Sequence, residues 1–232
     1  MKCRHCNNAL NGKFLDLGNC PPSNSFLSKE NLGVKEKSYP LRVLVCRSCW
    51  LVQTEDFVAP AEIFKPDYAY HSSVSLHFLE HAKNYVDQVT SRFSLNEKSL
   101  VMEVAANDGY LLQYVKEKGI PCYGIEPTES TSRIAISKGL HIVKDVFGSD
   151  LANLLANKGK TADLTIANNV LAHVPDINDF VSGFCTILKP DGVAIFENPH
   201  LLELIEKKQF DTVYHEHFSY LSLTAVDKIF RA

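Results

Sequence analysis

The sequence lacks an apolar run long enough to cross a membrane, because its longest apolar runs have the length of single β-strands. It also lacks the apolar core of a signal peptide after the N-terminal MKCRHC. Basic residues are not in excess, since the 232 residues carry a formal net charge of −3, and this argues against binding to nucleic acid. We therefore expect a globular protein of the cytoplasm that binds neither a membrane nor nucleic acid.

The glycine pattern G-x-G-x-x-G of dinucleotide-binding turns is absent as well. Residues 100–127 nevertheless read LVMEVAANDGYLLQYVKEKGIPCYGIEP, in which two apolar runs flank a short helical pattern that stops at Gly119. This order predicts a strand, a tight turn, a helix and a parallel strand that ends at Glu126. An acid at that place is suited to accept hydrogen bonds from both hydroxyls of a ribose.

The turn itself places Ala105, Asn107 and Gly109 at alternate positions. Turns that bind S-adenosylmethionine usually carry three glycines there, in the pattern E/D-x-G-x-G-x-G. Alanine is the next smallest residue and asparagine tolerates a left-handed backbone, so we expect the backbone still to approach a ligand closely. The alternative is an ordinary strand–helix–strand crossover without a ligand.

Strands and helices continue to alternate along the rest of the chain. Strands are expected at 141–143, 162–167 and 193–197, and helices at 78–93, 130–138, 149–158, 177–188 and 201–208, with a last helix that ends at Phe230. This alternation predicts an α/β fold with a mostly parallel sheet that helices cover on both faces.

The candidate cofactor-binding residues follow the ends of the expected strands, at the carboxyl edge where open α/β sheets bind ligands. They are Glu103, Ala105, Asn107, Asp108, Gly109, Glu126, Pro127, Asp145, Val146, Asn168, Asn169 and His173. Asp145 is suited to accept a hydrogen bond from the amino group of an adenine, and an N-cap of the following helix is its alternative role.

Four of the seven cysteines form two C-x-x-C pairs, Cys3 with Cys6 and Cys46 with Cys49. Thiols stay reduced in the cytoplasm, so we interpret the pairs as metal ligands and not as disulfides. Four thiolates make a closed tetrahedral zinc site, and two such pairs separated by a hairpin-like segment indicate a structural zinc ion. The other three cysteines are expected to be buried thiols: Cys20, Cys122 and Cys185.

Taken together, the motifs resemble those of the sugar C-methyltransferases that act on nucleotide-linked 4-keto-6-deoxyhexoses. The matching segments are the paired C-x-x-C module, YHSSVS, EVAANDG, GIEP, NNVLAHVPD, LKPDGVAIFENP and FDTVYHEHFSYLS. The resemblance implies a class I methyltransferase (Rossmann-like) fold, bound S-adenosylmethionine, a structural zinc ion and a nucleotide-sugar substrate. It also implies that the Y-x-E-H-F stretch from Tyr214 to Phe218 lies against the sugar, with Tyr68 or Tyr70 nearby.

Methylating a carbon beside a ketone requires a base that removes the α proton. His217 is the best candidate because histidine titrates near neutral pH, with Tyr214 and Glu216 as further candidates. In a regular strand Glu216 would point away from His217, so it assists only if the stretch is bent. The alternatives are a structural role for His217 and a metal pair of His215 with His217.

The residue patterns divide the chain into a zinc-binding module at 1–58, a connector with an amphipathic helix at 59–98 and a methyltransferase domain at 99–232. Within the module, residues 12–40 are rich in Gly, Pro, Asn and Ser and are not expected to pack a core without help.

Relatives in the family that the chain resembles continue with two more strands and a C-terminal domain, which are missing after Phe230. We therefore expect a sheet that is incomplete at its C-terminal edge, self-association through that edge, and a very low turnover. The alternative functions are an O- or N-methyltransferase for another small molecule and a non-catalytic remnant that binds cofactor, zinc or a partner.

Overall fold

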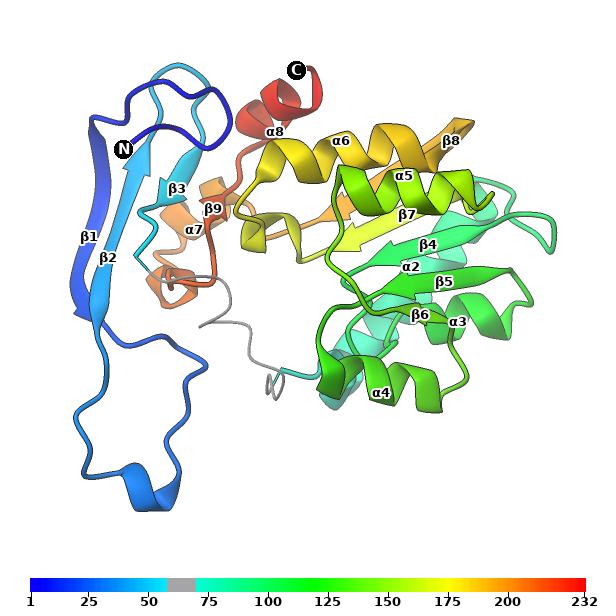
Figure 1. Ribbon diagram of the computed structural model, residues 1–232, viewed down its shortest axis with the longest axis horizontal. Helices are drawn as coiled ribbons and strands as arrows, with labels where there is room; N and C mark the ends of the chain where they lie inside the picture. Colours follow the sequence, from blue (N-terminus) through cyan, green and yellow to red (C-terminus); the bar gives the residue numbers. More distant parts are fainter. Residues whose placement is uncertain (58–69) are drawn as a thin grey trace. The chain divides into compact units, whose positions relative to one another are not determined.

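The computed structural model describes residues 1–57 and 70–232, and the contacts divide the chain into two compact units (Figure 1). Unit 1 consists of Met1–Lys65, Asn169–Asn178 and Asn198–Ala232, and unit 2 consists of Pro66–Asn168 and Asp179–Glu197. Unit 1 is therefore assembled from three separate stretches of sequence, whereas unit 2 is interrupted once.

Unit 2 is built on a five-stranded parallel sheet with the order β6-β5-β4-β7-β8. The strands are β4 (Val101–Val104), β5 (Cys122–Ile125), β6 (Ile142–Val143), β7 (Ala162–Asn168) and β8 (Leu188–Glu197). All four residues of β4 are buried, as expected for a central strand that helices cover on both faces. The parallel α/β sheet predicted from the alternating pattern is confirmed.

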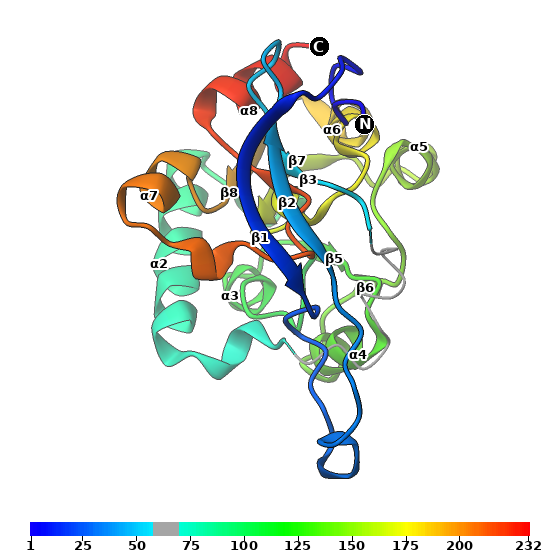
Figure 2. The ribbon, with the colours of Figure 1, turned by 90° about the vertical axis from the view of Figure 1, so that its left-hand side faces the viewer.

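Helices cover both faces of this sheet. The α-helices around the sheet are α2 (Leu76–Arg92), α3 (Leu112–Glu117), α4 (Glu129–Ser137), α5 (Ser149–Asn157) and α6 (Ile177–Ile187). α2 and α3 lie on one face of the sheet, and α5 and α6 lie on the other (Figure 2). Ser75 caps α2, because its hydroxyl accepts a hydrogen bond from Phe78 N at 3.3 Å.

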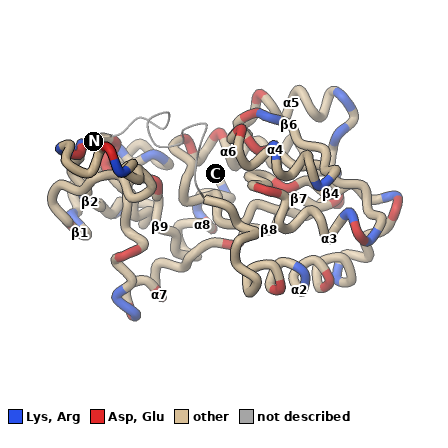
Figure 3. The backbone as a smooth tube through the Cα atoms, turned by 90° about the horizontal axis from the view of Figure 1, so that it is seen from below, with Lys and Arg blue, Asp and Glu red and all other residues tan. Residues whose placement is uncertain are grey.

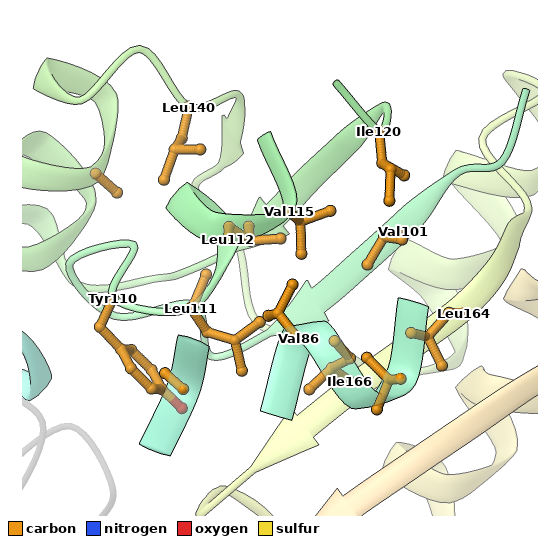
Figure 4. Packing of buried hydrophobic residues seen from close by; sticks show 14 residues of the cluster. Val86, Val101, Tyr110, Leu111, Leu112, Val115, Ile120, Leu140, Leu164 and Ile166 are labelled. Atoms are coloured by element: carbon orange, nitrogen blue, oxygen red, sulfur yellow. The ribbon is translucent and has the colours of Figure 1, made fainter. Parts of the chain in front are cut away.

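The core of unit 2 lies where α2 and α3 meet the sheet (Figure 4). Val86 of α2, Leu112 and Val115 of α3, and Leu164 and Ile166 of β7 are all buried in one cluster. Burying each of these side chains contributes roughly 1.5–3 kcal/mol before chain entropy is counted. The core anchors both β4 and α3, and it thereby fixes the two ends of the turn between them.

Unit 1 is built on a four-stranded antiparallel sheet with the order β1-β2-β3-β9. The strands are β1 (Gly12–Cys20), β2 (Tyr39–Val45), β3 (Val52–Thr54) and β9 (Ser219–Tyr220). β9 comes from the last stretch of the chain, yet it pairs with β3, with Val52 opposite Tyr220. The helix α7 (Leu201–Glu206) contributes Leu201 and Leu204 to the core of this unit.

The last helix, α8 (Leu223–Phe230), also belongs to unit 1. Ser222 caps it, since the Ser222 hydroxyl accepts a hydrogen bond from Ala225 N at 3.2 Å. Lys228 Nζ donates to Ser48 O at 2.8 Å and joins the helix to the second cysteine pair. The described 3₁₀ helices are η1 (Lys29–Asn31), η2 (Ser72–Val74), η3 (Leu171–His173) and η4 (Phe210–Thr212).

Two features bear on the sequence-based expectations, one in each unit. Residues 12–20, in the Gly- and Asn-rich segment, form β1, and the help that this segment needs comes from β2, which pairs along its length with two register shifts. Cys185 is exposed, so the expectation of a buried thiol is wrong there. The boundaries 1–58, 59–98 and 99–232 stay a prediction, while the contacts place Asn198–Ala232 in unit 1.

Charged residues of both signs are interspersed along α2 (Figure 3). Glu80, Lys83, Asp87 and Arg92 all lie on its exposed surface, a pattern typical of a solvated helix face. Among the described helices, none has both the length and the apolar character needed to span a bilayer.

Candidate functional site

The four cysteines of the two C-x-x-C pairs converge in unit 1. Their Sγ atoms all lie within 4.8 Å of one another. Cys3 Sγ lies 3.5 Å from Cys49 Sγ, and Cys6 Sγ lies 3.5 Å from Cys46 Sγ, so these sulfurs are too far apart for disulfides. Four sulfurs at such distances fit around one tetrahedral zinc ion, whose bonds to sulfur measure about 2.3 Å.

Both pairs have the same local fold, which we call knuckle 1 (residues 3–8) and knuckle 2 (residues 46–51). Asn7 N donates to Cys3 O at 3.0 Å, and Trp50 N donates to Cys46 O at 2.9 Å. Asn7 and Trp50 both have a left-handed backbone, with φ of 59° and 67°. The repeated bend after each pair turns both of its thiols toward the same point.

Knuckle 1 holds the segment Asn169–Asn178 in unit 1. Arg4 Nη1 donates to Pro175 O at 2.9 Å, and Asn178 Nδ2 donates to His5 O at 2.8 Å. The residues between the cysteines therefore support a part of the chain that is distant in sequence. That segment carries His173, one of the predicted site residues.

Residues 214–217 form a turn and not a regular strand, because His217 N donates to Tyr214 O at 3.1 Å. The turn brings the Tyr214 hydroxyl to 2.9 Å from His217 Nε2. His217 Nδ1 lies 2.9 Å from Thr212 O, and a carbonyl oxygen only accepts, so Nδ1 carries the proton and Nε2 the lone pair. Burial lowers the pKa of His217, which keeps the imidazole neutral at neutral pH.

His173 lies against His217, with ring centroids 4.6 Å apart and planes inclined by 63°. Burial and the proximity of His217 lower the pKa of His173, against the opposing effect of a hydrogen bond to the backbone of Glu216. Two neutral imidazoles therefore share one site in unit 1. The assignment of His173 to the cofactor stays a prediction.

Glu216 is 1% exposed and is held by a residue that sequence reasoning missed. Asn24 Nδ2 lies 2.7 Å and 2.8 Å from the two carboxylate oxygens of Glu216. Asn24 belongs to the loop between β1 and β2, where the run Pro21-Pro22-Ser23-Asn24 indicates only a turn. No pattern in the sequence connects this loop with the tail.

His215 points toward the start of β2, because its Nε2 lies 3.3 Å from both Tyr39 O and Pro40 O. The turn thus separates His215 from His217, which would share a face only in a regular strand. Within the ranges that the structure describes, the four cysteines are the only group of three or more potential ligands close enough to hold an ion. The metal pair of the two histidines therefore has no support.

In unit 2, the turn after β4 has the backbone that close approach to a ligand requires. Ala105, Asn107 and Gly109 have φ of 57°, 49° and 76°. Gly109 also has no room for a side chain, since a Cβ there would lie 2.3 Å from Leu140 Cδ1. The alternating pattern in the sequence therefore marks the positions with a left-handed backbone.

Glu126 is buried at the end of β5, and backbone N–H groups orient its carboxylate. Oε2 accepts from Asn107 N and Oε1 from Thr128 N, each at 2.9 Å. Each oxygen keeps a lone pair that can accept from a ribose hydroxyl. The predicted role therefore fits the geometry.

Glu103 is an acid on the neighbouring strand β4 that is 1% exposed. Its Oε2 has no hydrogen-bond partner among the described residues. Burial, followed by the charge of Glu126, raises the pKa of Glu103 well above its usual range. An unpartnered buried oxygen near a strand end is suited to a ligand that offers it a hydrogen-bond partner.

Asp145 and Val146 follow β6 and line a hollow in the surface of unit 2. Asp145 Oδ1 accepts from Val146 N at 2.8 Å. The N-cap of α5 is Gly148, and Asp179 Oδ1 accepts from Ser149 N at 3.2 Å, so the alternative role of Asp145 as an N-cap is wrong.

The other predicted residues are dispersed. Asn168 is buried at the end of β7, and its Oδ1 is unpartnered within the described part of the chain. Asn169 has φ of 54°, and Pro127 is exposed beside Glu126. Tyr70 is exposed, whereas Tyr68 lies outside the described residues.

Comparisons with known proteins agree with both parts of this description. The "Putative zinc binding domain" model matches residues 3–64, and the "Methyltransferase domain" model matches residues 78–232. The C-methyltransferase NovU of Streptomyces niveus is 30% identical over 231 residues, which are 100% of this chain and 55% of that protein. The ubiquinone biosynthesis O-methyltransferase of Rhodopseudomonas palustris is 27% identical over 119 residues, 47% of this chain and 46% of that protein. The chain thus spans about half the length of the curated relatives that it matches.

Solved structures share the fold at low sequence identity. The plantazolicin methyltransferase BpumL in complex with SAH has a TM-score of 0.51 at 10% identity, over 66% of this chain and 61% of that chain. A chain from the Haloferax volcanii complex of the Trm112 methyltransferase activator with its partner also has a TM-score of 0.51, at 15% identity, over 67% and 69%. The methyltransferase model covers most of the sequence and the sheet has the matching architecture, so this chain belongs to the methyltransferase family.

Proposed function

We propose that the chain is the S-adenosylmethionine-binding part of a C-methyltransferase. The proposed substrate is a nucleotide-linked 4-keto deoxysugar, which is deprotonated beside the ketone and methylated at C3. The observation that carries the proposal is the buried, neutral His217, whose Nε2 lone pair is fixed by the hydrogen bond of Nδ1 to Thr212 O. An imidazole oriented in this way is prepared to accept a proton.

The extent of the two curated matches favours carbon as the methylated atom. The C-methyltransferase NovU aligns with 100% of this chain and therefore with the turn at 214–217. The O-methyltransferase match covers 47% of this chain. O-methylation is the second candidate function, and it needs less base machinery because a hydroxyl is a better nucleophile than a carbon.

The cofactor would be held by residues of unit 2. When bound, S-adenosylmethionine supplies an electrophilic methyl group. Glu126 would accept from the ribose hydroxyls, the left-handed turn from Ala105 to Gly109 would admit the ligand close to the backbone, and Asp145 with Val146 would contact the adenine. The unpartnered oxygens of Glu103 and Asn168 support a ligand that offers them hydrogen-bond partners.

The proton would be removed in unit 1. His217 takes the α proton at Nε2, and the Thr212 carbonyl stabilises the resulting imidazolium through Nδ1–H. The Tyr214 hydroxyl, which donates to the Nε2 lone pair at 2.9 Å in the resting state, would turn its own proton away, and its oxygen would then accept from the new Nε2–H. Burial disfavours the charged imidazolium, so the proton is readily given up in a later step.

The four cysteines would hold zinc in a structural role. They form a closed set of sulfur ligands, with no water or carboxylate position, and closed sets are typical of structural zinc. The ion would fix knuckle 1, which holds the segment that carries His173. In this way zinc would support the proposed catalytic side chains without contacting substrate.

Substitution of His217 by Asn tests the proposal. Exchange of the α proton of a nucleoside-diphosphate 4-keto-6-deoxyhexose with deuterated water should slow by about 10²- to 10⁴-fold, because the base is lost. S-adenosylhomocysteine affinity, measured by calorimetry, should not change. Tyr214→Phe is the matched variant: it removes one hydroxyl next to the same ring and should have a smaller effect.

Exchange at the wild-type rate in the Asn variant would exclude His217 as the base and direct attention to Glu216 or Tyr214. A wild-type chain that binds S-adenosylhomocysteine but shows no exchange with any keto sugar would contradict C-methylation and favour the O-methyltransferase candidate.

Self-association through the sheet edge is a further part of the proposal. β8 is the last strand in the sheet order, so one side of it has no strand partner within the described residues. Unpaired edge strands tend to pair with another chain. Light scattering should therefore show dimers or larger species, and a monodisperse monomer would refute this.

A further inference from the structure

Asn107 stands where turns that bind S-adenosylmethionine usually carry glycine, and its side chain contacts the segment that precedes α2. Asn107 Nδ2 donates to Tyr70 O at 3.2 Å. Ser72 N donates to Asn107 Oδ1 at 2.9 Å. The side-chain amide of Asn107 thus both donates to and accepts from the same segment. A glycine at this position would make neither hydrogen bond.

Asp108 adds a second attachment to the same segment. Its Oδ2 accepts from Ser73 N at 3.1 Å and from Ser73 Oγ at 2.5 Å. Asp108 is 1% exposed, so water competes little for the oxygen that accepts these hydrogen bonds. Two consecutive residues of the turn are therefore joined to residues 70–73 by four hydrogen bonds.

Asn107 also contacts the predicted ribose acid, because Asn107 N donates to Glu126 Oε2 at 2.9 Å. A ligand bound to Glu126 is thus one residue away from the segment before α2. The far end of that segment is fixed independently, since the ring of Phe78 in the first turn of α2 stacks on Tyr110 with centroids 4.9 Å apart. The segment is held at one end by the core and at the other by the turn.

We propose that Asn107 and Asp108 are positioning residues that clamp residues 70–74 to the cofactor-binding turn and couple ligand binding at Glu126 to the placement of Tyr70. The clamp consists of Asn107, Asp108, Tyr70, Ser72 and Ser73. Binding that orders the turn reduces the cost of ordering a segment tied to it, which is the physical basis of the coupling. The coupling rests on the proposed cofactor, whereas the clamp does not.

Replacement of Asn107 by Gly removes the side-chain amide and permits the backbone φ of 49°. Hydrogen exchange at the amides of Ser72 and Ser73, measured by NMR on the full chain without ligand, should accelerate roughly tenfold or more. Ser94→Gly is the control, because Ser94 is an exposed residue with φ of 52° and lies outside the clamp. It should leave both amides within about twofold of wild type.

A conservative variant separates the two contacts of the amide group. Asn107→Asp keeps an acceptor for Ser72 N and loses the donor to Tyr70 O. Protection of the Ser72 amide should therefore be retained. Ser73→Ala acts on the clamp from the other side, removes one hydrogen bond to Asp108 and should accelerate exchange at the Ser73 amide by a smaller factor.

The coupling is tested with S-adenosylhomocysteine as the probe. In the wild type it should slow exchange at Ser72 and Ser73, and in Asn107→Gly this slowing should disappear. Because coupling is reciprocal, the affinity of the variant for the probe should fall by no more than the factor by which the probe slows exchange in the wild type.

Three outcomes would overturn parts of the proposal. Unchanged exchange at Ser72 in Asn107→Gly, or an equal rise in Ser94→Gly, would overturn the clamp. A wild type that binds S-adenosylhomocysteine without any change at Ser72 would overturn the coupling. A wild type that does not bind the probe would overturn the proposed cofactor and the coupling together. The clamp would still be tested by hydrogen exchange of Asn107→Gly and Ser94→Gly without ligand.

Discussion

Unit 2 is built from elements that follow one another along the chain, whereas unit 1 joins three stretches that are far apart in sequence. In unit 2 a large apolar cluster holds parallel strands, and the predicted ligand residues lie at the strand ends. In unit 1 the apolar cluster is smaller, and buried polar groups and four thiols complete the structure. We infer that hydrophobic packing specifies unit 2, while unit 1 depends on its metal and on individual polar contacts.

Loss of the metal should produce the largest difference in stability between the two units. Cys46→Ser, or a chelator, should remove amide protection from β2, β3 and β9 but leave β4, β5 and β7 protected, because metal binding supplies on the order of 10 kcal/mol to domains of this kind. Hydrogen exchange with mass spectrometry checks this, and metal analysis of the wild type should give about one zinc ion per chain.

The control for this experiment is Cys185→Ser, since Cys185 is exposed and lies outside the cysteine cluster. It should leave both the zinc content and the protection of unit 1 unchanged. Equal zinc content in Cys46→Ser would contradict the metal site, and loss of protection throughout both units would contradict their independence.

A packing defect in unit 2 should destabilise unit 2 and leave unit 1 intact. In Gly109→Ala the new Cβ lies 2.3 Å from Leu140 Cδ1 at a φ of 76°, so backbone strain adds to overpacking. We expect a loss of roughly 2–4 kcal/mol in the free energy of unfolding of unit 2, from both causes together. Gly119→Ala has a φ of 71° and nothing within 4 Å, and should cost only about 1 kcal/mol. Urea unfolding of unit 2, with zinc content as the readout for unit 1, checks this; equal costs for both variants would contradict it.

Mild acid should act on the two units in opposite directions. His173 and His217 have pKa values below the ordinary 6.5, so below that pH the unfolded state binds protons that folded unit 1 does not, and unit 1 loses stability. Glu103 has a raised pKa, so folded unit 2 binds its proton first and gains stability as the pH falls toward the ordinary value of 4.5.

The free energy of unfolding should change by at most about 1.4 kcal/mol per pH unit for each group. Acid also releases zinc, so each unit is compared with a variant that lacks the titrating group. For unit 1, His173→Gln should show a smaller dependence of stability on pH than the wild type. For unit 2, Glu103→Gln provides the same comparison. Thermal unfolding followed from pH 7.5 to 5 measures both. Slopes of the same sign in the two units would contradict the expectation.

The sequence predicted unit 2 well because its signals are local. The cap at Ser75, the stop at Gly119 and the acid at Glu126 each lie within a few residues of the element that they define. The cysteine spacing was equally informative, since each pair forms its own knuckle.

The parts of unit 1 that were not predicted all depend on long-range contacts. β9 has only two residues and no periodicity, and its pairing with β3 is visible only in three dimensions. The contact of Asn24 with Glu216 likewise joins a loop and a turn that carry no common signal. A bend at 214–217 was considered only as the condition under which Glu216 could assist His217, and nothing local requires it.

The pairing of β3 with β9 has a consequence for how the chain is made. The ribosome releases the two cysteine pairs before unit 2, but Val52 cannot pair with Tyr220 until that residue has been synthesised, after all of unit 2. Until then the outer edge of β3 is an unpaired strand edge on a nascent chain, of the kind that associates with other chains. Unit 1 is therefore finished after unit 2, whose last described strand ends at Glu197, and the sheet of unit 2 can form while that of unit 1 still lacks β9.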